Sequence, residues 1–265
     1  MASAFTDKEI YSREFNPRAY VETYFAENRG ALVIDEYLSF VLKQLFKIFS
    51  AGIVRGDTLI DIGTGPTIYQ LLSACEVFKE IIVTDYCEDN RQEFGKWLTN
   101  EPGHFDWSPI VRFVCELEGK RDKSTEKEEK LRQKVKQVLK CDVTKGYPLE
   151  PLVLPTADCL LSALCLEGAC KDQETFRDAL KNISSLLKIG GHLVMMGVLE
   201  ETFYMVGHYK FSCLFLDVEF VRNAVIDAGY TITDFQTSPR PENANHSLSD
   251  YKGYFFVVAH KVKDV

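Results

Sequence analysis

Several features that define common protein classes are absent from this sequence of 265 residues. No stretch reaches the roughly 18 consecutive apolar residues that a membrane-spanning helix requires. Residues 1–12 are polar and charged, and they lack the apolar centre of a secretory signal. We therefore expect a cytoplasmic protein that does not associate with membranes.

Metal-binding and redox motifs are also missing. The chain has 8 cysteines, but no two of them are separated by only two residues, as zinc and redox motifs require. Its 5 histidines are scattered, and His192 and His260 lie in apolar runs, where packing is the expected role. The cysteines are predicted to be free thiols that pack as small apolar side chains, and no metal ion is expected.

Excess positive charge is absent too. The formal net charge is −8, which disfavours binding to the phosphate backbone of nucleic acids. Residues 116–136 are densely charged, but both signs alternate at helical spacing, which predicts a solvated helix face. The length fits one α/β domain. We predict a monomeric single domain over 1–265, with an irregular, aromatic-rich lid segment over 1–30 and a core over 31–265.

Apolar runs and helical periodicity alternate along the core. Short β-branched runs predict strands, and the segments between them show the spacing of amphipathic helices. Such alternation implies a mostly parallel sheet with helices on both faces. No helix separates the final two strands, so they are expected to pair antiparallel at the edge. Strands are predicted at 58–62, 80–85, 138–141, 157–164, 192–196, 230–235 and 253–260, and helices at 35–49, 67–75, 91–98, 173–187 and 217–228.

The first strand leads into a glycine turn, Gly63-Thr64-Gly65. In doubly wound sheets, ligands bind outside the carboxyl ends of the strands near such a turn, where glycines let the backbone approach them. Asp85 ends the second strand, 22 positions after Gly63, a spacing that suits hydrogen bonds to ribose hydroxyls. Asp142 ends the third strand and is expected to meet an adenine edge, so that with Asp61 three acids lie on one rim.

A nicotinamide cofactor is the rival interpretation of this turn. Its fingerprint needs a third glycine for the pyrophosphate, and residues 66–69 read Pro-Thr-Ile-Tyr instead. S-adenosylmethionine has no phosphate, and its cationic sulfonium and amino-acid end suit an acidic rim. We therefore expect S-adenosylmethionine as the methyl donor and S-adenosylhomocysteine as the product.

With these motifs, the chain resembles the small-molecule amine methyltransferases, which include the nicotinamide, phenylethanolamine and indolethylamine N-methyltransferases. The resemblance implies a class I methyltransferase fold with a Rossmann-like seven-stranded sheet. The segments that carry it are 15–20, 59–74, 83–85, 101–103, 141–143, 186–192 and 204–207. Phe25 stands where relatives often have a second tyrosine. By resemblance, the cofactor contacts are Tyr20, Phe25, Gly63, Gly65, Tyr69, Asp85, Asn90, Asp142, Val143 and Ala163.

Methyl transfer to nitrogen needs alignment of the reacting groups and no covalent nucleophile. Aromatic residues of the lid segment could close over the sulfonium, whose charge suits aromatic faces. Glu167 and Glu201 follow the fourth and fifth strands, so both are expected at the rim where a substrate lies. The candidate catalytic residues are Tyr20, Glu167 and Glu201, and the candidate substrate contacts are Tyr24, Glu167, Gly197, Glu201, Tyr204, Cys213 and Ser249.

Members of the resembled family differ at these positions. Nicotinamide methyltransferases have an aspartate at Gly197 and serines at Glu201 and Cys213, and none of these is present here. Phenylethanolamine methyltransferases resemble this chain around Glu167 and Glu201, where glutamates bind the amine. Their further amine-contacting aspartate falls at Ser249, however, and their catechol-facing lysine falls at Val41. The resemblance therefore favours an N-methyltransferase of small arylalkylamines. A nicotinamide or pyridine N-methyltransferase and a cofactor-binding protein without activity remain the alternatives.

Overall fold

Seven strands form the central sheet of the computed structural model, which describes residues 5–26, 35–242, 245 and 247–265. The strand order is β3-β2-β1-β4-β5-β9-β8. The chain-terminal strand β9 runs antiparallel to both of its neighbours, and the other pairs are parallel, as predicted. The bounds are β1 Thr58–Ile62, β2 Glu80–Asp85, β3 Val135–Lys140, β4 Ala157–Ala163, β5 Leu187–Leu199, β8 Tyr230–Pro239 and β9 Gly253–Lys261.

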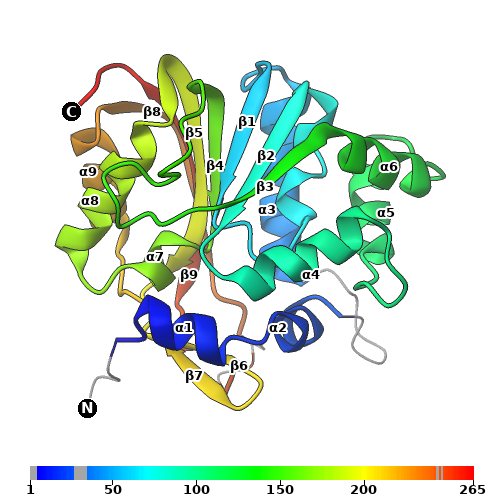
Figure 1. The fold of residues 1–265 in the computed structure, drawn as a ribbon, viewed down its shortest axis with the longest axis horizontal. Coiled ribbons are helices and arrows are strands. Elements are labelled where there is room, and N and C mark those ends of the chain that lie inside the picture. The colour runs from blue at the N-terminus through cyan, green and yellow to red at the C-terminus, as the bar shows by residue number, and fades with distance from the viewer. Residues whose placement is uncertain (1–4, 27–34, 243–244, 246) are drawn as a thin grey trace.

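Helices cover both faces of the sheet (Figure 1). Successive strand residues point to opposite faces, so Leu59 joins one apolar core while Ile60 joins the other. The first core packs against α3 (Glu36–Ser50), α4 (Glu88–Leu98), α5 (Ser108–Leu117) and α6 (Ser124–Lys134). The second packs against α7 (Leu166–Ala169), α8 (Gln173–Ser184) and α9 (Val218–Asp227). The alternation confirms the predicted doubly wound sheet with helices on both faces.

The lid segment is helical where it was predicted to be irregular. Asp7 caps α1 (Lys8–Glu14), where its side chain accepts a hydrogen bond from the Ile10 amide at 2.8 Å. Asn16 caps α2 (Pro17–Tyr24), whose first residue is a proline suited to that position. Caps of this kind satisfy amides that a short helix otherwise leaves unpaired. The remainder of the predicted lid, 1–4 and 27–30, lies outside the described residues.

The predicted helix over 67–75 is wrong. Two short 3-10 turns, η1 (Tyr69–Leu71) and η2 (Ala74–Glu76), stand there instead. The Thr67 hydroxyl donates to the Thr64 carbonyl at 2.9 Å, and the Gln70 amide donates to Asp61 Oδ2 at 2.9 Å. Side chains that bond to nearby groups in this way compete with α-helical hydrogen bonding. The result is a tight connection under the glycine turn.

Other differences concern element ends. Gly190, predicted to stop α8, lies inside the first part of β5 with φ at +87°, and α8 already ends at Ser184. The sequence analysis also missed α5 and an antiparallel hairpin, β6 (Phe203–Val206) with β7 (Tyr209–Ser212). The hairpin lies beside α1 and α2 across one end of the sheet (Figure 1).

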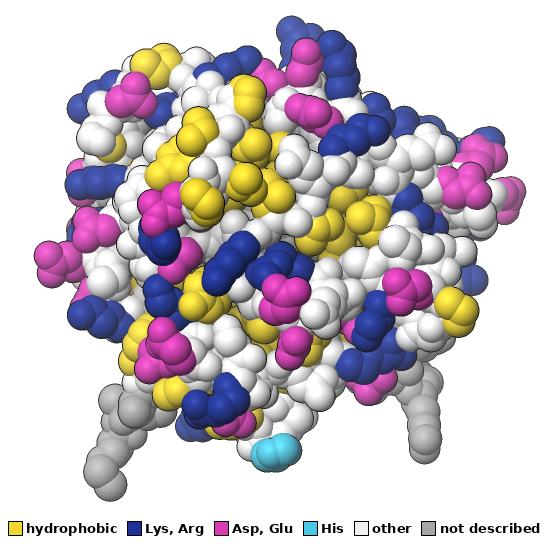
Figure 2. Space-filling model, viewed as in Figure 1, with side chains coloured by type: hydrophobic (Ala, Val, Ile, Leu, Met, Phe, Trp, Pro, Cys, Tyr) yellow, Lys and Arg dark blue, Asp and Glu magenta, His cyan; other side chains and the backbone are white. Residues whose placement is uncertain are grey.

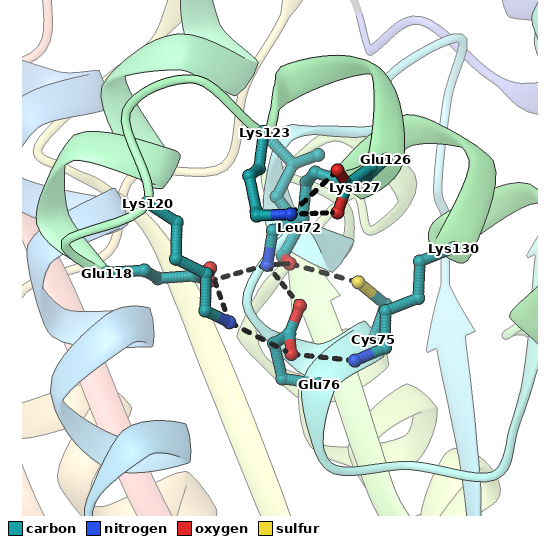
Figure 3. A network of polar contacts seen from close by, with 9 residues as sticks. All are labelled: Leu72, Cys75, Glu76, Glu118, Lys120, Lys123, Glu126, Lys127 and Lys130. Atoms are coloured by element: carbon teal, nitrogen blue, oxygen red, sulfur yellow. Dashed lines mark hydrogen bonds and ion pairs between the residues drawn. The ribbon is translucent and has the colours of Figure 1, made fainter.

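The charged segment 116–136 is only partly the solvated face that was predicted. Lys127 on α6 is buried, with 2% of its side chain exposed. Its ammonium donates to Glu118 Oε1 at 2.6 Å, to Glu76 Oε1 and to the Leu72 carbonyl at 3.4 Å. Figure 3 shows Lys127 at the centre of this network, with Lys120 and Lys130 approaching Glu76 from the outside. The network joins α6 to the end of α5 and to η2.

The surface carries charges of both signs, which are interspersed over the face drawn in Figure 2. All 8 cysteines are free, and 6 of them are buried, as predicted. The rings of His192 and His260 contact each other across β5 and β9, 5.3 Å apart, in the packing role expected for them. Among the described residues, no helix is both long enough and apolar enough to span a bilayer.

Candidate active site

A cavity of about 650 Å³ lies at the carboxyl ends of the parallel strands. Helices α1 and α2 and the β6–β7 hairpin close it from outside (Figure 1). Ligands of doubly wound sheets bind at this edge. The cavity brings together most of the residues predicted from the sequence, namely Tyr20, Tyr24, Phe25, Gly63, Gly65, Tyr69, Asp85, Asp142, Val143, Ala163, Glu167, Glu201, Tyr204, Cys213 and Ser249.

Three predicted positions do not line the cavity. Asn90 is fully buried beside Asp85, to which its amide donates at 3.0 Å, while its Oδ1 has no partner among the described residues, so its contact with the cofactor stays a prediction. Asp61 is also fully buried and accepts from Gln70, which gives it a structural role beneath the glycine turn. Gly197 lies under Glu167 and Phe255 and offers no side chain to a ligand. The prediction of three acids on one rim therefore holds for Asp85 and Asp142 only.

Asp85 is held rigidly at the end of β2. Its Oδ1 accepts from the Cys87 amide at 2.8 Å and from Asn90 at 3.0 Å, and its Oδ2 accepts from the Gly65 amide at 2.8 Å. Burial raises its pKa, although these bonds oppose the change. A carboxylate accepts about four hydrogen bonds. Asp85 thus has room for one ribose hydroxyl, and the second bond that we expected would require displacing the Gly65 amide.

The two turn glycines serve different purposes. Gly63 has φ at +68°, and a Cβ there would lie 2.2 Å from the Cys165 sulfur, so its missing side chain accommodates Cys165. Gly65 has φ at +61°, and a Cβ there would meet no atom within 4 Å. Both glycines line the cavity, but only at Gly65 is the side-chain position open, as expected for a turn against which a ligand lies.

Asp142 is the second acid on the cavity wall. It accepts from the Thr144 amide at 3.1 Å and hydroxyl at 2.6 Å, and from the Lys8 ammonium of α1 at 2.8 Å. Burial acts to raise the pKa of Asp142, but these donors outweigh it and the net direction is downward. One acceptor position stays open, which suits the amino group of an adenine. Two buried carboxylates and the open Gly65 backbone together fit the nucleoside of S-adenosylmethionine.

Aromatic rings line the side of the cavity that α2 covers. The Tyr20 ring lies 5.2 Å from Tyr24 and 5.7 Å from Phe25, and the Phe25 ring stacks on Tyr69 at 5.3 Å. The Tyr24 hydroxyl donates to the Met205 carbonyl at 2.8 Å, which ties α2 to the hairpin. Burial raises the pKa of Tyr20 well above its usual value, so the phenol stays neutral. Neutral aromatic faces of this kind attract cations.

Glu167 and Glu201 approach the same cavity from the ends of β4 and β5. They are buried, with 5% and 6% of their surfaces exposed. The Val198 amide donates to Glu167 Oε1 at 3.3 Å, and the Ser249 hydroxyl donates to Glu201 Oε1. Neither glutamate forms an ion pair with any residue that the structure describes. Two buried carboxylates without a cation are unusual, because unpaired buried charge is costly.

The pKa values of the pair reflect this environment. Burial raises the pKa of Glu167 to about 7, and repulsion from Glu201 adds to the effect. Burial likewise raises the pKa of Glu201 to about 7, although its bond from Ser249 opposes the change. Carboxyl groups that titrate near neutrality inside a cavity are typical of sites that bind cations or transfer protons.

Backbone strain precedes both glutamates. Leu164 and Glu200, which follow β4 and β5, have φ of +53° and +55°. Non-glycine residues rarely adopt this left-handed region, and each such residue costs on the order of 1 kcal/mol. Strain at the two strand ends that carry Glu167 and Glu201 is consistent with a functional site, and nothing in the sequence indicated it.

Several cavity residues were not predicted. Lys8 and Tyr11 come from α1, and Tyr37, Arg240 and Tyr254 come from α3 and from the segments around β8 and β9. The amphipathic pattern of α3 indicated that Tyr37 would be buried, but it did not distinguish the core from a cavity. Arg240 lies in a polar loop that carried no signal of a site.

We expect Asp85→Ala to weaken binding of S-adenosylmethionine at least tenfold, since a bond to a charged acceptor contributes about 1.5–3 kcal/mol. Calorimetric titration measures the change, and circular dichroism checks the fold. Asp89→Ala removes a carboxylate from an exposed position nearby and serves as the control. Equal affinities of the two variants would contradict the assignment of Asp85 to the cofactor.

Comparison with solved structures supports the fold. Magnesium protoporphyrin IX methyltransferase from Synechocystis PCC 6803, solved with bound S-adenosylmethionine, matches with a TM-score of 0.60. The match covers 98% of this chain and all of that one at 12% sequence identity, a level that speaks for the fold alone.

Sequence comparison gives closer relatives. The pig nicotinamide N-methyltransferase is 53% identical over 99% of this chain and 98% of its own length. The rabbit indolethylamine N-methyltransferase is 48% identical over 98% of both chains. The human phenylethanolamine N-methyltransferase is 43% identical over 94% of this chain and 90% of its own. The model of the NNMT/PNMT/TEMT family matches residues 3–262. The chain therefore belongs to this family of S-adenosylmethionine-dependent N-methyltransferases of small amines.

Proposed function

We propose that this enzyme methylates the nitrogen of a small arylalkylamine. The observation that carries the proposal is the pair of buried carboxylates, Glu167 and Glu201, neither of which forms an ion pair within 4.0 Å with a described residue, although the charge of Arg240 acts on Glu201 from the wall of the same cavity. An alkylamine enters as an ammonium and supplies that missing charge. Aromatic side chains around the same cavity, including Tyr20 and Tyr204, suit an aryl group attached to the amine.

Bound S-adenosylmethionine supplies the electrophilic methyl group. Glu167 and Glu201 hold the ammonium and orient its nitrogen, and alignment of reacting groups can contribute ~7–11 kcal/mol. The nitrogen must lose a proton before its lone pair can attack. A glutamate with a pKa of about 7 can accept that proton at neutral pH, which assigns a general-base role to Glu167 or Glu201. Tyr20, Tyr24 and Phe25 exclude water from the side of the cavity that α2 covers.

The space around Gly197 bears on the alternative, methylation of nicotinamide or another pyridine. A Cβ at Gly197 would lie 2.5 Å from Glu167 Oε1 and 2.7 Å from the Phe255 ring. The volume that a side chain at 197 would occupy is thus taken by Glu167. This favours the alkylamine over a neutral carboxamide, although the named nicotinamide N-methyltransferases share the greater sequence identity.

A substrate panel with methyl-labelled cofactor tests the proposal. We expect phenylethylamine, phenylethanolamine and tryptamine to be methylated with higher kcat/KM than nicotinamide or quinoline. Turnover of nicotinamide far above every alkylamine would replace the proposal with the pyridine alternative. Absence of turnover for all amines, with cofactor binding intact, would favour a cofactor-binding protein without activity. A cytosolic location and a monomeric state remain predictions from the sequence.

A further inference from the structure

Arg240 is a cavity residue that neither the fold nor the proposed reaction explains. It follows β8, and its backbone amide donates to the Lys252 carbonyl at 2.9 Å, which fixes its position beside the last strand. Its Nη1 donates to the Tyr251 carbonyl at 2.7 Å, and its guanidinium stacks 4.2 Å above the Tyr251 ring. These contacts hold the side chain in one orientation at the cavity wall.

The other edge of this guanidinium has no partner in the described part of the chain. Nε and Nη2 are both buried, and neither donates a hydrogen bond to any residue that the structure describes. No ion pair within 4.0 Å joins Arg240 to Glu201, Asp35 or any other described carboxylate. A buried donor left without an acceptor costs about 1–3 kcal/mol, and more when it is charged. Among the described residues, these two donors are therefore open to a ligand.

The two unpaired nitrogens determine what that ligand is. Nε and Nη2 share one side of the planar guanidinium, and their N–H groups point the same way. This side-on fork matches the two oxygens of a carboxylate in a bidentate pair. A single hydroxyl or carbonyl oxygen could accept from both donors only through less linear bonds, and it would bring no charge to pair with the guanidinium.

The surroundings of Arg240 are aromatic. Tyr251 and Tyr254 pack with ring centroids 4.8 Å apart, and Tyr37 lies 5.0 Å from Tyr254. All three line the same cavity as Arg240 and Glu201. The cavity thus combines carboxylates suited to an ammonium, rings suited to an aryl group and a fork suited to a carboxylate.

We propose that Arg240 is a specificity-determining residue that binds a carboxylate on the substrate, so that the preferred substrates are arylalkylamines with an anionic ring substituent. The inference rests on the proposed alkylamine function. It extends that function to amphoteric substrates, whose ammonium lies at Glu167 and Glu201 and whose carboxylate lies at Arg240.

Matched substrates test the proposal. The wild-type enzyme is assayed with 3- and 4-(2-aminoethyl)benzoate and with the corresponding benzamides, and binding to the protein saturated with S-adenosylhomocysteine is measured by calorimetry. We expect at least one benzoate to exceed its benzamide about tenfold in affinity and in kcat/KM, as one charge-assisted pair gives.

Arg240→Met keeps an unbranched side chain over Tyr251 and removes the fork. It is expected to abolish the preference, so that the benzoate and its benzamide give kcat/KM values within about twofold of each other, since neither substrate then forms the pair. Arg240→Lys should restore only part of the preference, because an ammonium cannot bind bidentately. Lys252→Met removes a positive charge from an exposed neighbour and should leave the preference intact.

Equal affinity and equal kcat/KM of the wild-type enzyme for each benzoate and its benzamide would overturn the proposal. So would a loss of affinity for S-adenosylhomocysteine in Arg240→Met, which would place the cofactor's own carboxylate at Arg240. These results are distinct from failure of the proposed function, which would appear as absence of methylation of phenylethylamine and of both benzamides.

Discussion

Replacing Glu201 with glutamine is expected to lower kcat/KM for phenylethylamine and tryptamine about 10- to 100-fold, as the loss of one charge-assisted hydrogen bond implies. Glutamine keeps the shape of the side chain and its bond to Ser249 but removes the charge that holds the ammonium. Glu167→Gln should have a comparable effect, since both carboxylates are buried in the same cavity.

The matched control for this experiment is Glu200→Gln. Glu200 is adjacent in sequence but exposed, so its charge is screened by solvent and its replacement should leave amine kinetics unchanged. A neutral pyridine should respond little to Glu201→Gln, because it brings no charge for the carboxylate to pair with. Unchanged amine kinetics in both Glu167→Gln and Glu201→Gln would rule out the alkylamine function.

The pH dependence of kcat/KM for alkylamines also tests the role of the two glutamates. Only ionised glutamates bind the ammonium or accept its proton, and burial places the pKa of each near 7. We therefore expect kcat/KM for alkylamines to rise with pH through about 7. Burial remains the main cause of the raised pKa of Glu167 in Glu201→Gln, but the repulsion from Glu201 is gone. The inflection in this variant should consequently move to lower pH.

Glu201→Gln should raise the stability of the ligand-free protein at pH 8, although it lowers activity towards amines. The folded-state pKa of Glu201, about 7, lies above its ordinary value of 4.5. A raised carboxyl pKa favours the folded state below pH 4.5, and this stabilisation is lost as pH rises through about 7. At pH 8 the ligand-free wild-type enzyme thus contains a buried charge that glutamine lacks. Thermal unfolding at pH 8 should show a higher Tm for Glu201→Gln, which separates lost chemistry from lost folding.

The sequence predicted those elements whose signals are local. The bounds of β1 and β2 match the prediction, because each is a short apolar run that ends at a glycine turn or an aspartate. The β6–β7 hairpin was missed because its strands have four residues each and are largely half-buried, so they show no clean alternation. Its position depends on contacts with α1 and α2, for example from Tyr24 to Met205, 181 residues apart.

The site residues also divide into those with a local sequence signal and those positioned by contacts with distant residues. Asp85, Glu167 and Glu201 could be predicted because they follow strands whose ends share one edge of the sheet. Arg240 could not, because it is positioned by Tyr251 across a loop and not by any periodic pattern. Asn90 and Gly197 do not line the cavity themselves: Asn90 donates to Asp85, and Gly197 leaves room for Glu167. A sequence motif does not show which residues of a site line its cavity and which lie behind them.

The periodicity of α6 predicted a solvated helix face, and it missed the burial of Lys127 because that burial also depends on distant residues. Glu and Lys alternate along it in a pattern typical of solvent-exposed helices, and only Lys127 and Leu131 of its 11 residues are buried. Lys127 is buried because α5 and η2 pack over it, and its partners Glu76 and Glu118 come from 51 and 9 residues away. Burial acts to lower the pKa of Lys127, but its surroundings reverse the direction, so the ammonium stays charged.

Lys127→Ala is expected to lower the free energy of unfolding by about 3–5 kcal/mol, the usual cost of removing one partner from a buried ion pair. The substitution leaves the Glu118 carboxylate, whose side chain is only 7% exposed, with no buried cation and with only the more exposed Lys120, 3.6 Å away. Urea unfolding measures the loss. Lys123→Ala is the control: Lys123 and its partner Glu126 are 54% and 66% exposed, so its removal should cost no more than about 1 kcal/mol.

A double-mutant cycle identifies the pair as the cause. Glu118→Gln should cost less in the Lys127→Ala background than in the wild-type protein, because the carboxylate that it removes has then already lost its buried partner. Acid titration gives a second check. The bonds from Lys127 and Lys130 outweigh burial and lower the pKa of Glu76 to about 2, from an ordinary value of 4.5. A lowered carboxyl pKa stabilises the fold above pH 4.5, and this contribution is lost as pH falls towards 2. The difference in free energy of unfolding between wild type and Lys127→Ala should therefore narrow as the pH falls from 4.5 towards 2. A difference that does not depend on pH would indicate that packing of the lysine stem, and not its charge, holds α6 in place.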